Sequence, residues 1–310
     1  MFGFFKRKKV PQWASFMEKK QYEKFMDALT AFLESNGAPS YKIDDGVLLF
    51  YDESPFGLEQ AGLQNLAQTC ATQMPENYSV IMADHFDSLK KTAEFFQNFE
   101  TELQDFDKVK GYIGLRIHGE EYISQVRERA VFREYGEELY GQLVFDLPDS
   151  VRSLHPDEAA HWQRTEDELF ELARANIRHN YSVEKNWYEH SGSGFWIIGA
   201  DHFFSPNVIL DLEENEDWLG SQGALVGVPN RHGVLLHPIN SLKVVNIIGA
   251  MASACASMYN SGPGSISPNL FWYKGKSFIR LPYAINKDKT EFYPPDLFTD
   301  MLNELSEADS

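Results

Sequence analysis

An adjacent acid and histidine, Asp201 and His202, are the side chains in this sequence whose types best suit catalysis. They follow the apolar stretch 195–200, which has the length and composition of a buried strand. A histidine oriented by a carboxylate can act as a general base, and α/β proteins often place such residues at strand ends. However, neighbouring side chains on an extended chain point to opposite faces. The simpler interpretation is therefore a turn in which Asp201 caps backbone N–H groups.

A second pair, Arg231 and His232, lies in the segment VPNRHGV, whose composition predicts a turn between two strands. A guanidinium can clamp a carboxylate or a phosphate with two parallel hydrogen bonds. The alternative is an exposed hairpin turn that binds nothing. No catalytic residue can be assigned from these patterns. The candidate binding residues are Asp201, His202, Arg231 and His232.

Standard motifs for metals, cofactors and nucleophiles are missing from the sequence. The segment that starts at Asp211 alternates acidic residues like a calcium loop, but Glu216 stands where glycine is needed and Gln222 where glutamate is needed. The nine histidines show no zinc spacing, and neither Cys70 nor Cys255 lies in a nucleophile motif. The glycine motifs that bind phosphates and dinucleotides are missing too. We therefore expect no metal and no cofactor.

Charge and cysteine content indicate the compartment and the class of partner. The 310 residues include 28 basic and 46 acidic ones, for a formal net charge of -18. Such a charge repels nucleic acid and favours a basic protein partner, and the simpler interpretation is that it keeps the protein soluble in the cytoplasm. The two cysteines lie in apolar patterns, which suits the reducing cytoplasm. Residues 2–9 combine phenylalanines with a basic run, so the alternatives there are a frayed tail and a weak peripheral membrane contact.

Hydrophobic periodicity and turn residues predict an alternation of helices and strands. Helices are expected over residues 15–35, 58–72, 88–106 and 242–259, with another beginning near residue 165, and one helix or a helix pair over 120–140. Strands are expected over residues 47–51, 80–83, 112–117, 142–146, 195–200, 224–228, 234–237, 270–273 and 277–280, and an extra hairpin over 183–194. Asn176 interrupts an apolar helix face, so we expect its amide to bind the backbone of a neighbouring strand.

The tetrapeptide ADHF occurs twice, at residues 83–86 and 200–203, each time at the end of a predicted strand. The surrounding order of strands and helices also recurs, which indicates an internal duplication, with two similar but unrelated lobes as the alternative. The predicted fold class is α/β (α+β), with two similar mixed-sheet lobes covered by helices. The expected divisions are a basic N-terminus and long helix over 1–39, lobes over 40–138 and 139–285, and an acidic tail over 286–310.

Four segments carry a resemblance to a known family: YGQLVFDLPDSVRSLHP, ELFELARANI, GALVGVPNRHGVLLHP and SPNLFWYKGKSFIRLPY. In order and spacing, over residues 139–283, they resemble the YtpQ-like family of bacterial proteins, a domain of unknown function. The N-terminal helix and first strands match this family weakly, and the segment 183–194 is longer than its pattern. The resemblance implies a cytosolic α/β protein. It implies no established reaction and supplies no catalytic residues.

Two classes of function agree with these patterns. We expect a cytoplasmic, non-enzymatic interaction or regulatory protein whose acidic surface meets a basic partner. The alternative is an enzyme or small-ligand-binding protein that uses Asp201, His202 and Arg231 at a site between the lobes. Convergence of these three side chains on one site would favour the second class.

Overall fold

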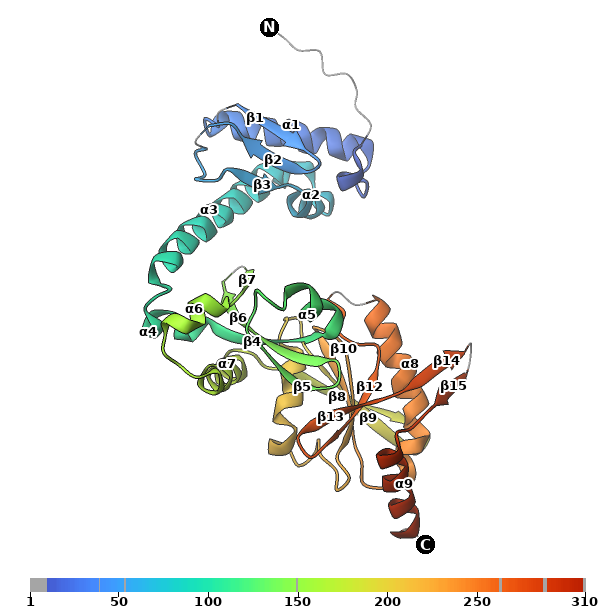
Figure 1. Ribbon diagram of the computed structural model, residues 1–310. Coiled ribbons are helices and arrows are strands. Elements are labelled where there is room, and N and C mark those ends of the chain that lie inside the picture. The colour runs from blue at the N-terminus through green and yellow to red at the C-terminus, as the bar shows by residue number, and fades with distance from the viewer. Residues whose placement is uncertain are drawn as a thin grey trace. The chain divides into compact units, whose positions relative to one another are not determined.

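The computed structural model describes residues 10–38, 40–52, 54–148, 150–261, 264–286 and 289–308. The alternative of a membrane contact through residues 2–9 concerns residues outside these ranges. The chain divides into two compact units, Met1–Glu102 and Leu103–Ser310. Both combine helices with sheets, so the predicted α+β class is confirmed (Figure 1).

The first unit packs helices against a small antiparallel sheet. Phe25, Leu29 and Leu33 of α1 are buried together with Leu48 of β2 and Phe86 of α3. α1 begins at Lys19 and not near residue 15, because the preceding residues form a 3-10 turn, η1. The elements are η1 (Gln12–Ala14), α1 (Lys19–Ser35), β1 (Tyr41–Asp44), β2 (Val47–Phe50), β3 (Gln60–Gly62), α2 (Gln64–Ala71), η2 (Pro75–Asn77) and α3 (Tyr78–Glu102).

The strand predicted at residues 80–83 is wrong, because this segment forms the start of the helix α3. Tyr78, Met82 and Phe86 are buried at a spacing of four residues, whereas Val80 is 61% exposed. That period is helical and not that of a strand. The first ADHF segment therefore lies in a helix and the second follows β9, so the two copies are not equivalent. The predicted internal duplication gains no support from them.

The second unit is built on a ten-stranded sheet in the order β4-β6-β5-β13-β12-β10-β11-β9-β8, with β7 paired to β6 (Figure 1). Neighbouring strands are antiparallel except β5 and β13, which are parallel. The strands are β4 (Ile113–Gly119), β5 (Phe132–Gly136), β6 (Leu139–Leu147), β7 (Ser150–Ser153), β8 (Glu184–His190), β9 (Ser193–Gly199), β10 (Ala224–Asn230), β11 (Gly233–Pro238), β12 (Leu270–Lys274) and β13 (Ser277–Leu281).

Strand pairing accounts for two differences from the sequence-based expectation. The helix predicted over 120–140 ends at Val126. The later part of this range forms β5, because residues Phe132–Gly136 pair with both β6 and β13. The boundary expected between residues 138 and 139 falls within this sheet, since β4 pairs with β6 along seven residues. The separation into compact units lies instead between Glu102 and Leu103.

Helices cover both faces of the sheet. Leu225 and Leu235 pack under α8 and α9, whereas Val226 and Val234 pack on the other face with η4. Asn176 of α7 donates to the backbone carbonyls of Lys110 and Ile113, as predicted from the sequence. The remaining elements are α4 (Phe106–Val109), η3 (Lys110–Tyr112), α5 (Glu120–Val126), α6 (Pro156–His161), α7 (Glu166–Asn180), η4 (Ser205–Glu214), η5 (Leu242–Val244), α8 (Val245–Ser261), β14 (Tyr283–Asn286), β15 (Lys289–Phe292) and α9 (Asp296–Ala308).

The helix α8 is the most apolar helix of the second unit. Within the described residues, the stretch Leu242–Asn260 has the length and composition of a membrane span. A core helix of a soluble protein passes the same test. Ile247, Met251 and Cys255 are fully buried against the sheet. The helix expected over residues 242–259 thus packs against the sheet.

Candidate functional site

In the segment after β9, the side chains of Asp201 and His202 lie in different environments. Asp201 is exposed, whereas the His202 ring lies 4.8 Å from the ring of Tyr181. His202 Nδ1 accepts from the Phe204 N–H at 3.2 Å, and Nε2 therefore carries the proton donated to the Ser182 carbonyl at 2.9 Å. The histidine caps this turn, and no Asp201–His202 hydrogen bond occurs among the described residues. This geometry is that of a turn and not of a general base.

A carboxyl group lies behind this turn. The Tyr181 hydroxyl donates to Asp146 Oδ2 at 2.7 Å. Burial raises the pKa of Asp146, and this hydrogen bond and the nearby His202 oppose the rise. Burial and the same hydrogen bond raise the pKa of Tyr181 well above its usual range. The pair joins β6 to the segment after α7 and is best explained as structural.

Arg231 and His232 form the turn between β10 and β11. The Arg231 Nε–H donates to His232 Nε2 at 3.0 Å, and His232 Nδ1 lies 3.3 Å from the Ala200 carbonyl. An imidazole that accepts at Nε2 can carry a proton on Nδ1, the atom that faces the Ala200 carbonyl. The Arg231 stem packs under Gly264, where an added Cβ would lie 2.6 Å from Arg231 Cδ.

Phe203 connects this turn to a strand far away in the sequence. Its ring is 38% exposed, and the guanidinium carbon of Arg231 lies 4.1 Å from the ring centroid. The guanidinium carbon of Arg116, on β4, lies 5.8 Å from the same centroid. The His232 ring meets Phe203 edge to face at 5.9 Å. Two cations and an imidazole thus surround one aromatic ring.

Arg116 forms no ion pair and no hydrogen bond within the described residues, and its Nε is buried without a partner. Burial lowers the pKa of its guanidinium, Tyr122 opposes this, and the positive charge of Arg231 lowers it further. Arg231 likewise has no carboxylate partner in the part of the chain that the structure describes. By contrast, Arg174 and Arg178 are both held by Asp211 and Glu214.

His118 lies two residues beyond Arg116 on the same face of β4. It is 7% exposed, its Nε2 has no hydrogen-bond partner, and its ring stacks on Tyr122 at 4.0 Å. Burial lowers its pKa to about 3, with a further contribution from Arg116 and an opposing hydrogen bond with Gln142. His118 is therefore neutral at pH 7 and offers an unused nitrogen.

A close backbone approach joins these segments. An added Cβ on Gly119 would lie 2.1 Å from the Ile266 carbonyl oxygen, so only glycine allows this contact between the end of β4 and the segment after α8. The same segment accepts the Arg231 N–H through the Gly264 carbonyl at 3.0 Å. We call the resulting group the arginine site, which comprises Arg116, His118, Tyr122, Phe203, Arg231 and His232.

The arginine site has the chemistry of an oxyanion receptor. Guanidinium groups match carboxylate and phosphate oxygens in geometry and charge. Of the four residues expected from sequence, Arg231 and His232 belong to it, whereas Asp201 and His202 do not. Arg116, His118, Tyr122 and Phe203 were missed. The one available signal was the charged residue within the apolar strand segment YIGLRI. Within the described ranges, no cluster of three or more His, Cys, Asp or Glu is placed to hold a metal.

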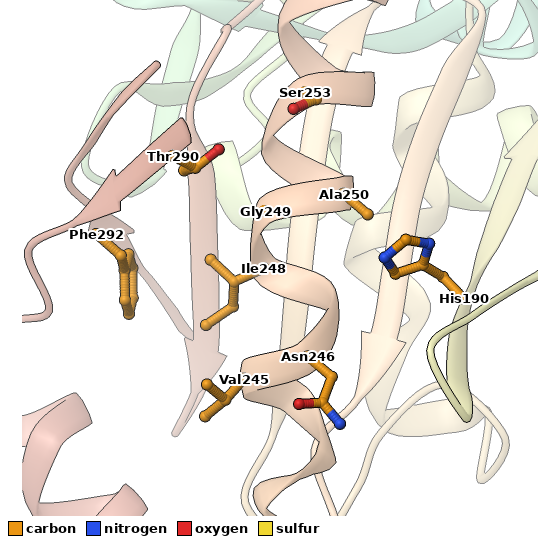
Figure 2. Close-up of a pocket in the computed structure, with 9 residues that line it drawn as sticks. All are labelled: His190, Val245, Asn246, Ile248, Gly249, Ala250, Ser253, Thr290 and Phe292. Atoms are coloured by element: carbon orange, nitrogen blue, oxygen red, sulfur yellow. The ribbon is translucent and has the colours of Figure 1, made fainter. Parts of the chain in front are cut away.

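A groove of about 540 Å³ lies elsewhere on the second unit, along α8 (Figure 2). Thr290 and Phe292 of β15 stand on one side of the helix and His190 of β8 on the other. Gly249 forms part of the helical surface between them. The lining residues include no acid, lysine or arginine, so the groove suits a neutral or apolar group. They are His190, Val245, Asn246, Ile248, Gly249, Ala250, Ser253, Thr290 and Phe292.

Comparison of this chain with protein-family models, with curated proteins and with solved structures found no match. Function must therefore be argued from the geometry of the site itself.

Proposed function

We propose that this protein binds a small anionic ligand, a carboxylate or a phosphate, at the arginine site. The observation that carries the proposal is the convergence of Arg116 and Arg231 on Phe203 without a carboxylate partner among the described residues. The chain has 46 acidic residues, so an acid at this place would have been easy to supply. The absence of a carboxylate partner for these two arginines among the described residues supports a role for an external anion.

The energetics support the same proposal. A cation that is removed from water without a partner costs several kcal/mol or shifts its pKa. Arg116 is partly in this position, because it is half-buried and its Nε is buried without a partner, and Arg231 adds like-charge repulsion. An oxyanion between the two guanidiniums would offset both costs and could accept hydrogen bonds from each. The uncharged His118 would add a polar contact without adding charge.

Calorimetric titration with three probes tests this proposal: inorganic phosphate, phenyl phosphate and benzoate. The two ring compounds differ only in the anionic group, so their comparison separates phosphate from carboxylate. We expect at least one probe to bind, and Arg116→Gln and Arg231→Gln each to weaken that binding roughly tenfold or more. Arg129→Gln is the matched control, because it removes the same charge from an exposed residue. Absence of binding by all three probes, or equal affinity in all three variants, overturns the proposal.

The interaction or regulatory function that the sequence predicts is our second proposal. It is a cytoplasmic, non-enzymatic interaction or regulatory protein with a basic partner, related to the YtpQ-like family. The net charge of -18 supports the basic partner, and the buried free thiols of Cys70 and Cys255 support a reducing compartment. Ligand binding at the arginine site is compatible with this class, since a bound anion can regulate an interaction.

A further inference from the structure

The two edges of the large sheet differ in how their backbone groups are satisfied. At the β4 edge, Asn176 donates to the Ile113 carbonyl at 2.8 Å and Asn207 to the Leu115 carbonyl at 2.7 Å. Side-chain amides thus occupy that edge. At the other edge, no strand within the described residues pairs with the outer side of β8. All residues of β8 except His190 are exposed.

The hairpin register shows which groups of β8 face outward. His190 pairs with Ser193 across a two-residue turn, in which Ser191 has φ 49° and Gly192 has φ 74°. These values are typical of a type I′ turn, whose flanking pair is hydrogen-bonded. Because hydrogen-bonded and non-bonded pairs alternate, every second residue of β8 directs its N–H and C=O away from β9. These residues are Lys185, Trp187 and Glu189.

The outward residues are complementary to a second copy of themselves. An antiparallel pairing with its twofold axis at Trp187 would place Lys185 of each strand opposite Glu189 of the other. Opposite charges in directly facing positions stabilise strand pairs. The next residues also match, since Glu184 would face His190. In this register, outward-facing residues of one strand also lie opposite outward-facing residues of the other, so Lys185, Trp187 and Glu189 would all form hydrogen-bonded pairs.

Exposed aromatic side chains lie along this edge. Trp187 is 46% and Tyr188 48% exposed, on opposite faces of the strand. Trp187 packs edge to face on Trp196, with ring centroids 5.0 Å apart, so its orientation is already restricted. His190 also lines the groove along α8 (Figure 2). A second strand at this edge would therefore cover part of both faces.

We propose that two copies of this protein associate through antiparallel pairing of β8 with β8, which extends the ten-stranded sheet across the twofold axis. The occupant of the edge is a second copy because the pattern of charges about Trp187 is self-complementary. Isologous contacts of this kind close at two subunits. A single strand pair buries a small area, so the dimer dissociates upon dilution.

Analytical ultracentrifugation of the full chain over a range of concentrations tests this proposal. Lys185→Glu places Glu opposite Glu189, and Glu189→Lys places Lys opposite Lys185; each creates two repulsive contacts per dimer. We expect each single variant to raise the dimer dissociation constant roughly tenfold or more. The double variant Lys185→Glu/Glu189→Lys restores opposite charges and should return the constant to within about threefold of the unsubstituted protein.

Two controls make the result decisive. Lys90→Glu reverses an exposed charge on α3 and should leave the dissociation constant unchanged. Circular dichroism establishes that each variant is folded, which matters because Lys185 also lies 4.0 Å from Asp217. A protein that stays monomeric up to about 0.2 mM overturns the proposal. So does a dimer that is insensitive to both single variants, or one that the double variant fails to restore.

Discussion

His118 and Arg116 lie on the same face of β4, and burial affects them differently. Burial favours the uncharged form of both, but a guanidinium stays protonated at any ordinary pH whereas an imidazole does not. Arg116 therefore remains an uncompensated cation, and His118 becomes a neutral polar group beside it. At the scale of residues, a bound anion would neutralise the unpaired positive charge of the arginine site.

The depressed pKa of His118 predicts a pH dependence of stability. The unfolded chain takes up the proton near pH 6.5, but the folded protein does so only near pH 3. Its contribution to the free energy of unfolding is therefore complete above pH 6.5 and falls by about 1.4 kcal/mol per unit as pH decreases toward 3. Urea denaturation at pH 7, 6, 5 and 4 should show a shallower decrease for His118→Gln.

The exposed His179→Gln variant controls for the loss of a histidine and should keep the slope of the unsubstituted protein. Some slope will remain in His118→Gln, because burial also lowers the pKa of His85 and of His237. Parallel slopes for His118→Gln and the unsubstituted protein would show that His118 does not titrate in this way.

At the scale of elements, β4 depends on side chains from outside the sheet. It pairs with β6 on one side only, and Asn176 and Asn207 supply donors to its other side. A buried carbonyl without a donor costs about as much as a lost hydrogen bond. These amides therefore hold in place the strand that carries Arg116.

Replacement of Asn176 by alanine should destabilise the protein by about 2 kcal/mol, because it removes donors from the carbonyls of both Lys110 and Ile113. Urea denaturation followed by circular dichroism measures this change. Asn180→Ala, at the exposed end of the same helix, is the matched control and should change stability by less than about 0.5 kcal/mol. Equal stabilities of the two variants would contradict this account of the β4 edge.

At the scale of the whole molecule, each unit has its own hydrophobic core. The cluster around Phe25 and Phe86 draws only on the first unit, and those around Val226 and Leu225 draw only on the second. A unit that buries its own apolar residues has what independent folding requires. The arginine site and the β8 edge both belong to the second unit.

The second unit, residues Leu103–Ser310, should therefore fold when it is produced alone. We expect a cooperative thermal transition by circular dichroism, because its apolar clusters remain complete. Near-ultraviolet signals from its tryptophans should match the corresponding part of the spectrum of the full chain. A gradual transition without fixed aromatic signals would mean that this unit needs the first one in order to fold.

Local patterns in the sequence determined much of the second unit. The hairpin expected over 183–194 has its turn where β8 meets β9, although β9 continues to Gly199 and includes most of the strand expected over 195–200. The strands expected at 224–228 and 234–237 are β10 and β11. Asn176 was correctly expected to bind a strand backbone. Such features depend on a few neighbouring residues: turn formers, alternation, or one polar residue on an apolar face. The ADHF repeat led to a wrong strand prediction at residues 80–83, because four residues do not show whether the flanking apolar residues follow a helical period or that of a strand.

Only the tertiary structure decided which residues form the site. Arg116 and Arg231 are far apart in the chain, and four strands separate β4 from β10 in the sheet. They meet because both approach the ring of Phe203, which lies in the segment between β9 and η4. Likewise, β5 is a strand because β6 and β13 flank it, against the helical pattern of residues 120–140. Charge and composition depend on the sequence alone, but proximity depends on long-range pairing, which no short window contains.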